Sequence, residues 1–163
     1  MKIIQGSTKE IAGPVTNWAE IMSDAKEMAD MIDKGGFEGN WTDCFALAHA
    51  QVSDSPKAFF VVDKKVAESF NGHRVIANAK IVKKSCPRSF QEGCMSFPYR
   101  SKKTMRRYDK ITIECDILEK RHELDKISIK EMLVPARFEL EGLEAYIVQH
   151  EIDHAKGIDI YHK

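Results

Sequence analysis

The sequence predicts a single α+β domain. Alternating or wholly apolar strand-like segments are concentrated between residues 58 and 140, and helical periodicity occurs near the N-terminus and again close to the C-terminus. The strands come early and a helix comes late, and strands do not alternate regularly with helices, which favours the α+β class. The chain has 163 residues, enough for one core and too few for two ordinary domains. We therefore expect one domain, residues 1–163, in which mixed or antiparallel sheets pack around a central C-terminal helix, with an N-terminal amphipathic helix.

The composition excludes several classes of protein. Basic and acidic residues are balanced, 25 against 25, so no net field favours DNA or an anionic membrane. No apolar run is long enough to span a bilayer, and the N-terminus lacks the layout of a secretory signal. The four cysteines contain no CxxC pair, and we expect them to be thiols in a reducing compartment. These features predict a soluble, cytoplasmic protein.

The first elements are an arm and a helix. Residues 1–15 are expected to be extended, and Thr16 is placed to cap the segment that follows. A helix ending at Gly35-Gly36 is predicted because apolar residues recur at helical spacing. These are Trp18, Ile21, Met22, Ala25, Met28, Ala29 and Ile32.

The middle of the chain predicts strands. Residues 58–62 form an apolar run, residues 74–82 form one or two further strands, and Asn71-Gly72 is the turn between them. Cys86-Pro87 is expected to break this run. Residues 111–117 alternate cleanly, which places Cys115 in the core. Further strands are expected at residues 127–134 and 138–140, before a helix that starts near residue 141.

That last helix carries the sequence Gln-His-Glu-Ile-Asp-His at residues 149–154. Residues four apart lie on one face of a helix, so His150 and His154 present two imidazoles to one metal ion. Glu151 flanks the same face and is placed to act as a base toward a water molecule. The alternative is a pair of core histidines that bond only to backbone carbonyls.

A catalytic site of this type needs a third ligand. Downstream of His154 the chain offers no residue at a suitable spacing, so the third ligand must lie upstream. Cys94 is the best candidate, because Gly93 permits an unusual backbone angle before it and a thiolate is a strong donor. An ordinary loop thiol remains the alternative for Cys94 at this point.

Two separated motifs now resemble a known family. Glu92-Gly93-Cys94-Met95-Ser96 and the 149–154 segment resemble the EGCLS and QHExDH motifs of the peptide deformylases, and the likeness extends from the N-terminal arm to the end of the chain. The resemblance implies a metal held by Cys94, His150 and His154. Ferrous iron is the first choice, with zinc or nickel as substitutes. It also implies hydrolysis of the formyl group from the N-terminal formyl-methionine of new polypeptides.

The third family motif, GxGLAAxQ, is altered here. Aligned on Gln51, its glycines become Cys44 and Ala46, and its second alanine becomes His49. Ala46 would be strained if the backbone required a positive φ. We expect His49 to point to solvent, with a narrowed cleft as the alternative.

The residue types indicate a mechanism. Glu151 accepts a proton from water and passes it to the leaving amine. By resemblance, Gln51 and the backbone N–H of Met95 donate to the oxyanion, and such a donor is typically worth about 3 kcal/mol. Glu92 and Gln149 are candidates for orienting the ligands. Asp153 is expected to be solvated or to form a salt bridge.

An apolar pocket that suits a methionine side chain should adjoin the metal. Leu143, Tyr146 and Ile147 precede His150 by one and two turns, and the family layout adds further residues to the substrate site. These are Phe45, Ala46, Leu47, Phe90, Glu92 and Gly93. For Arg100, Arg106 and Arg107 we expect a solvated surface, with binding of the peptide backbone or ribosomal RNA as the alternative.

Three functions remain open from the sequence. The first is a deformylase acting on formyl-methionyl nascent chains, as a monomer that also contacts the ribosome, in a bacterium or a phage-infected cell, or in an organelle. The second is another metallo-amidase or peptidase. The third is a non-catalytic binding module with an altered first motif.

Overall fold

The computed structural model describes residues 1–163 apart from 7–9, 35–43, 98, 123–128 and 163. Five strands form one antiparallel sheet in the order β1-β2-β3-β4-β5. Their bounds are β1 Ala46–Ala48, β2 Phe59–Val62, β3 Val75–Glu92, β4 Lys103–His122 and β5 Ile129–Glu141. The helices are α1 Met22–Asp33 and α2 Leu143–Ala155, and the 3-10 turns are η1 Trp18–Glu20, η2 His49–Gln51 and η3 Val66–Phe70.

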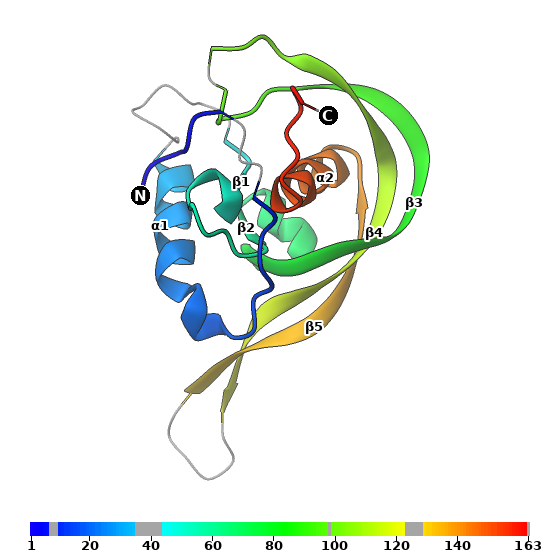
Figure 1. The fold of residues 1–163 in the computed structure, drawn as a ribbon. Coiled ribbons are helices and arrows are strands. Elements are labelled where there is room, and N and C mark those ends of the chain that lie inside the picture. The colour runs from blue at the N-terminus through cyan, green and yellow to red at the C-terminus, as the bar shows by residue number, and fades with distance from the viewer. Residues whose placement is uncertain (7–9, 35–43, 98, 123–128, 163) are drawn as a thin grey trace.

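The predicted α+β class is confirmed. In Figure 1, the long strands β3 and β4 curve around α2, and α1 lies beside β1 and β2. All four residues of β2 are buried because side chains alternate between two covered faces of the sheet. Phe60 and Val62 pack in the cluster that includes α2, whereas Phe59 and Val61 pack in the cluster that includes α1. The sheet therefore separates two apolar layers, one under each helix.

The N-terminal helix follows its predicted periodicity. Ala25, Met28 and Ile32 are its buried residues, and Ile21 lies beside them in the same cluster. The predicted cap is displaced by one residue: Asn17, not Thr16, accepts the N–H of Glu20 and begins η1. Thr16 instead donates to the Glu20 carboxylate from its own N–H and hydroxyl. The predicted end of the helix at Gly35-Gly36 lies outside the described residues.

The N-terminal arm ties distant parts of the chain together through backbone hydrogen bonds. The N–H of Ile4 donates to the carbonyl of Gln51 at 2.7 Å, and that of Gly6 donates to the carbonyl of Ser96 at 2.9 Å. Further along, Ala12 bonds to Ala155 at the end of α2. The arm thus braces the segments that follow β1 and β3.

The predicted break at Cys86-Pro87 is wrong, because β3 continues through both residues to Glu92. Cys86 adopts a φ of 57°, and Pro87 still pairs with Tyr108 of β4. Within the described chain, β2 pairs with β3 only as far as Ala77, so the rest of β3 is an edge strand. A proline is tolerated there because its missing N–H would face no partner. The turn predicted at Asn71-Gly72 is present, with φ of 54° and 87°.

The two strands predicted before the last helix are one. β5 runs without interruption from Ile129 to Glu141 through Pro135, and it pairs with β4 along its whole length. The predicted start at residues 127–128 lies outside the described residues. Gly142 then turns the chain with a φ of 64°, and α2 begins at Leu143. None of the helices in the described ranges is long and apolar enough to cross a membrane.

Candidate active site

Three side chains that are distant in sequence converge at the centre of the molecule. The His150 and His154 Nε2 atoms lie 3.0 Å apart, and Cys94 Sγ lies 3.4 Å from His154 Nε2. All three donor atoms are within 4.8 Å of one another. The structure therefore brings together the three residues that the sequence predicted as metal ligands.

The positions of these ligands follow from the elements that carry them. His150 and His154 are one turn apart on α2, which packs through Val148 and Ile152 against the sheet. Cys94 follows the end of β3 by two residues and is buried with Met105 and Ile160. Gly93 has no positive φ, so the unusual backbone angle predicted for it is absent. The curvature of β3 around α2, rather than a strained glycine, brings the thiol to the imidazoles.

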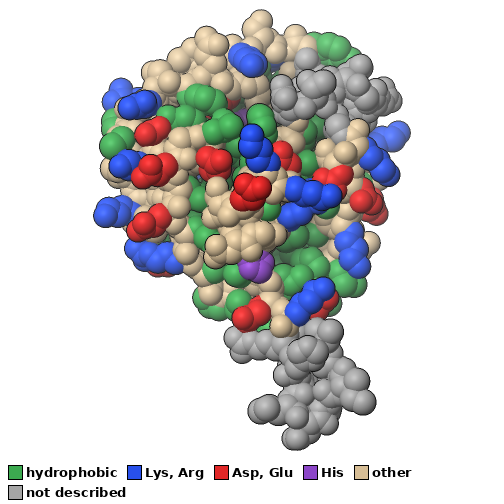
Figure 2. Space-filling view, turned by 180° about the vertical axis from the view of Figure 1, so that it is seen from behind, with side chains coloured by type: hydrophobic (Ala, Val, Ile, Leu, Met, Phe, Trp, Pro, Cys, Tyr) green, Lys and Arg blue, Asp and Glu red, His purple; other side chains and the backbone are tan. Residues whose placement is uncertain are grey.

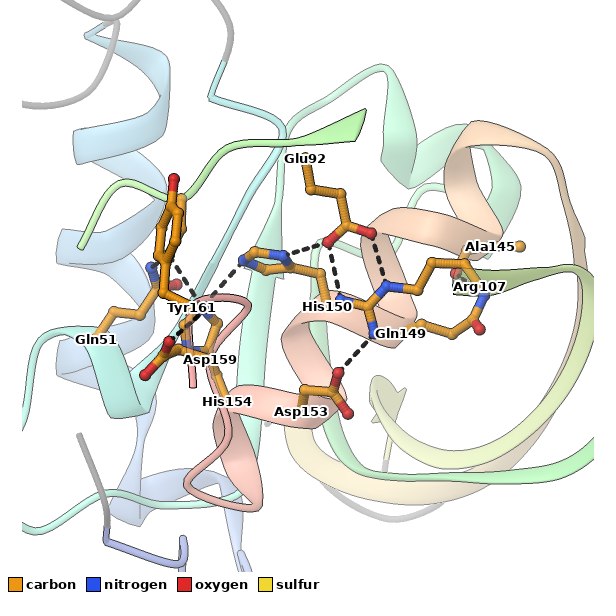
Figure 3. A network of polar contacts seen from close by, with 11 residues as sticks. Gln51, Glu92, Arg107, Ala145, Gln149, His150, Asp153, His154, Asp159 and Tyr161 are labelled. Carbon is orange, nitrogen blue, oxygen red and sulfur yellow. Dashed lines mark hydrogen bonds and ion pairs between the residues drawn. The ribbon is translucent and has the colours of Figure 1, made fainter. Parts of the chain in front are cut away.

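Figure 3 shows a chain of ionic contacts behind the ligands. His150 Nδ1 donates to Glu92 Oε1 at 2.8 Å. Arg107 donates to both oxygens of Glu92, at 2.6 and 2.8 Å, and to Asp153 at 2.5 Å. The guanidinium is the main reason that the pKa of Glu92 falls to about 2 despite its burial. Glu92 is therefore a carboxylate that fixes the tautomer of His150 and leaves its Nε2 free to bind a metal.

Arg107 corrects the expectation of a solvated basic stretch. Its side chain is only 2% exposed, whereas Arg100 and Arg106 are exposed as predicted. The alternation that marks Ile111, Ile113 and Cys115 as inward continues backward to Arg107 and Met105. That periodicity is the sequence signal that could have identified Arg107 as buried.

Glu151 lies in an enclosed position beside the ligands. Its residue is 4% exposed, and its Oε2 atom has no hydrogen-bond partner among the described residues. Burial raises the pKa of Glu151 to about 7. A carboxyl group with a pKa near neutrality and an unengaged oxygen is suited to accepting and returning a proton.

Gln51 reaches the same site from η2. Its Oε1 accepts the N–H of Ala48 at 3.0 Å, and its Nε2 donates to Ser96 Oγ at 3.2 Å and to Cys94 Sγ at 3.6 Å. Met95, the next residue after Cys94, lines the cavity. Ser96 was not singled out from the sequence, and its role as the partner of Gln51 becomes visible only in the fold.

The altered first motif brings no backbone strain. Neither Cys44 nor Ala46 has a positive φ, and Ala46 begins β1. The expectation for His49 is wrong, however: the residue is 3% exposed and points away from solvent. It is buried because Asp24, the N–H of Lys57 and the ring of Phe59 surround it. Its partner Asp24 lies on α1 between Ile21 and Met28, next to the buried face of that helix. This position of Asp24 is the sequence signal that could have indicated a buried partner for His49.

A cavity of about 360 Å³ opens beside the cluster. Most of the predicted substrate residues line it. They are Phe45, Ala46, Phe90, Glu92, Gly93, Leu143, Tyr146 and Ile147. Leu47 does not, because it is fully buried with Val61 in the core under α1. Gln149 is placed differently as well: it bonds to the backbone of Tyr108 and to the carbonyl of Ala145, so it fastens α2 to β4.

The donor set fits a divalent transition metal. Thiolates and imidazoles are both ligands of zinc, and a catalytic zinc site takes three protein ligands and keeps its fourth position for water or substrate. Burial lowers the pKa of His154 to about 3, so this ring is neutral, as a ligand must be. For His150, hydrogen bonds to Cys94 and Glu92 outweigh burial and raise the pKa to about 10. The surrounding negative charge therefore favours a cation at this point.

Comparisons with known proteins agree with this geometry. The family model of polypeptide deformylase matches residues 2–163. The chain is 31% identical over 131 residues to peptide deformylase 1 of Coxiella burnetii, covering 78% of this chain and 68% of that protein. It is 32% identical over 112 residues to the peptide deformylase of Chromobacterium violaceum, and the match covers 69% of this chain and 57% of that protein. The chain thus spans about two thirds or less of these relatives. A peptide deformylase structure from Legionella pneumophila superposes with a TM-score of 0.72 at 27% identity. The superposition covers 97% of this chain and 82% of that chain.

Proposed function

The chain belongs to the polypeptide deformylase family, and from this premise we propose that it removes the formyl group from the N-terminal formyl-methionine of new polypeptides. One observation carries the proposal. A cysteine and two histidines converge within 4.8 Å of one another, next to a buried glutamate and an apolar cavity. This combination of ligands, base and pocket supplies the parts that hydrolysis of a small amide at a metal uses.

Cys94, His150 and His154 would hold the metal, with ferrous iron as the first choice and zinc or nickel as substitutes. Such an ion lowers the pKa of a water molecule toward neutrality and polarises the formyl carbonyl. The chain's own contribution is to fix the two rings. Glu92 orients His150 from behind, and Arg107 keeps Glu92 ionised.

Glu151 is the proposed general acid and base. It accepts the proton of the attacking water and passes it to the nitrogen that leaves as the new N-terminal amine. Its burial and its unengaged Oε2 support both steps, because a pKa of about 7 allows the same group to take and release a proton at neutral pH.

Gln51 and the backbone N–H of Met95 are the proposed donors to the oxyanion. The amide nitrogen of Gln51 already points toward Cys94 and Ser96, so it lies at the edge of the ligand cluster. Its other end is held by the N–H of Ala48. A donor that is fixed before the substrate arrives costs no reorganisation in the transition state.

The cavity supports methionine as the first residue of the substrate. Its apolar wall comes from α2 and from β3, where Phe90 stacks on Tyr146 with ring centroids 4.4 Å apart. An unbranched, flexible thioether side chain fits such a surface. We further propose that the protein acts as a monomer in the cytoplasm of a bacterium or a phage-infected cell, on nascent chains at the ribosome.

The test is formate release from a formyl-Met peptide by protein loaded anaerobically with iron, or with nickel. We expect turnover by the natural chain. Glu151→Gln should reduce kcat by at least about 10²-fold, the lower end for a general acid or base, while the metal content stays at that of the natural chain.

Glu144→Gln is the matched control, because Glu144 lies on the same helix but does not line the cavity. If Glu151→Gln released formate as fast as the natural chain, the proposed role of Glu151 would be contradicted. Cleavage of unformylated peptides would point to a general peptidase, and metal binding without turnover on any formyl peptide would point to a binding module.

A further inference from the structure

The buried ring of His49 makes three directed contacts. Its Nδ1 accepts the backbone N–H of Lys57 at 2.9 Å, its Nε2 lies 3.0 Å from Asp24 Oδ2, and its face stacks on Phe59 at a centroid distance of 4.6 Å. These partners belong to α1, to the segment before β2, and to β2 itself. A single side chain thus joins η2 to three neighbouring parts of the fold.

The contacts specify the form of the ring. A backbone N–H can only donate, so Nδ1 carries no proton and Nε2 carries the proton that is donated to Asp24. Burial lowers the pKa of His49, as does the Lys57 charge, while Asp24 raises it. The neutral ring is therefore the form that fits, and it has no hydrogen-bonding atom left for another role.

His49 shares its 3-10 turn with Gln51. The two residues form the ends of η2, and the N–H of Val52 closes the turn by donating to the carbonyl of His49 at 3.0 Å. From this short turn, the ring of His49 reaches α1 while the amide of Gln51 reaches Cys94 and Ser96. Any shift of the turn moves the amide relative to the ligand cluster.

We propose that His49 is a positioning residue that sets the location of the Gln51 amide by pinning η2 to α1 and to the segment at Lys57. This inference rests on the proposed function, and it assigns a use to one of the residues that depart from the GxGLAAxQ motif. His49 belongs neither to the ligand cluster nor to the lining of the cavity, so we expect it to act on the reaction through Gln51.

The decisive experiment is a double-mutant cycle between His49 and Gln51, measured as kcat per bound metal well below the melting temperature. Removing an oxyanion donor typically lowers kcat by about 10²- to 10³-fold. We expect His49→Ala to lower kcat about tenfold, because it displaces the Gln51 amide without removing it. In a Gln51→Ala background, the same change should alter kcat by less than twofold, because the group it positions is gone.

Two variants separate positioning from folding. Asp24→Ala removes one contact of His49 without opening the core, since the Asp24 side chain is 43% exposed, and it should lower kcat less than His49→Ala does. Val66→Ala truncates a buried residue of η3 in the opposite apolar layer and should lower the melting temperature with kcat unchanged. A purely stabilising His49 would behave like Val66.

A second measurement does not depend on turnover. The side-chain amide resonance of Gln51, identified in an NMR spectrum by its loss in Gln51→Ala, should shift in His49→Ala and stay in place in Val66→Ala. A resonance that does not move, or a His49→Ala effect that persists undiminished without Gln51, would overturn the inference. If the natural chain releases no formate, the proposed function fails while the NMR comparison still decides the role of His49.

Discussion

The contact between His150 and Glu92 shows how a single side chain prepares a ligand. Glu92 accepts the Nδ1 proton of His150 at 2.8 Å and is itself held by two bonds from Arg107. The ring can therefore neither rotate nor exchange tautomers without breaking an ionic contact. Its Nε2 atom is directed at the other two ligands before any ion binds.

Glu92→Gln should weaken metal binding. The amide can still accept from His150, but it removes the negative charge that raises the basicity of the ring, and it no longer matches both donors of Arg107. We expect the Kd for zinc to rise about 10- to 100-fold, measured by competition with a chromogenic chelator. Glu139→Gln, an exposed change on β5, is the control. Equal affinity in the two variants would contradict the orienting role.

The same carboxylate predicts how stability depends on pH. Its pKa is lowered from 4.5 to about 2 in the fold, so its contribution is complete above pH 4.5 and is lost as the pH falls toward 2. At neutral pH the contribution is at most about 3 kcal/mol. Urea unfolding of the metal-free natural chain and of Glu92→Gln should differ at pH 7 and converge near pH 2. A difference that persists at pH 2 would show that another interaction is responsible.

Some of these residues could be found from the sequence and others could not. Cys94, His150, His154 and Glu151 lie in short local motifs whose spacing carries the chemistry. The structure brings the first three together, and Glu151 lines the same cavity as Cys94 and His150. Arg107 and His49 were expected at the surface because charge and polarity usually place residues there. The alternation along the strand indicates that Arg107 faces inward, but the partners of the two buried side chains, Glu92 and Asp24, lie 15 and 25 residues away and are not specified by it.

At the scale of elements, the sequence predicts where strands occur better than where they end. The alternation of residues 111–117 and the apolar run at residues 58–62 correspond to β4 and β2. Cys86-Pro87 was expected to break one strand, and residues 127–134 and 138–140 were expected to be separate strands, yet β3 passes through Pro87 and β5 through Pro135. A proline terminates a central strand but not an edge strand, and edge positions are a property of the sheet that the sequence does not reveal.

The free edge of β3 leads to a prediction on solubility. Beyond Ala77 its outer side pairs with no strand among the described residues, and it carries the exposed cations Lys83 and Lys84. Charged residues on an edge prevent pairing with a second chain. Replacing both lysines with valine should increase aggregation on warming, followed by light scattering. Lys110→Val on β4, whose two sides are both paired, should have little effect; equal aggregation would argue against edge protection.

At the scale of the whole molecule, the numbers of acidic and basic residues are equal, and on the face shown in Figure 2 neither sign is segregated. Figure 2 shows acidic and basic side chains interspersed over the face opposite to that of Figure 1, in keeping with 25 residues of each sign. Inside the molecule, Arg107 joins β3, β4 and α2 through ion pairs with Glu92 and Asp153. The cost of desolvating these charges offsets much of their attraction, so the network is weak evidence for a large contribution to stability.

Removal of the metal should lower the stability of the entire domain. The ligands come from the segment after β3 and from α2, so a bound ion connects two elements that form only if the chain is folded. A ligand at 100 times its Kd stabilises the native state by about 2.7 kcal/mol. For a chain of this size that amounts to about 5 to 11 °C in Tm, measured by calorimetry of zinc-loaded protein with and without a chelator.

The chelator should change the Tm of His154→Asn far less, because that variant has lost one of the three ligands. A shift of the same size in both proteins would mean that the ion binds elsewhere.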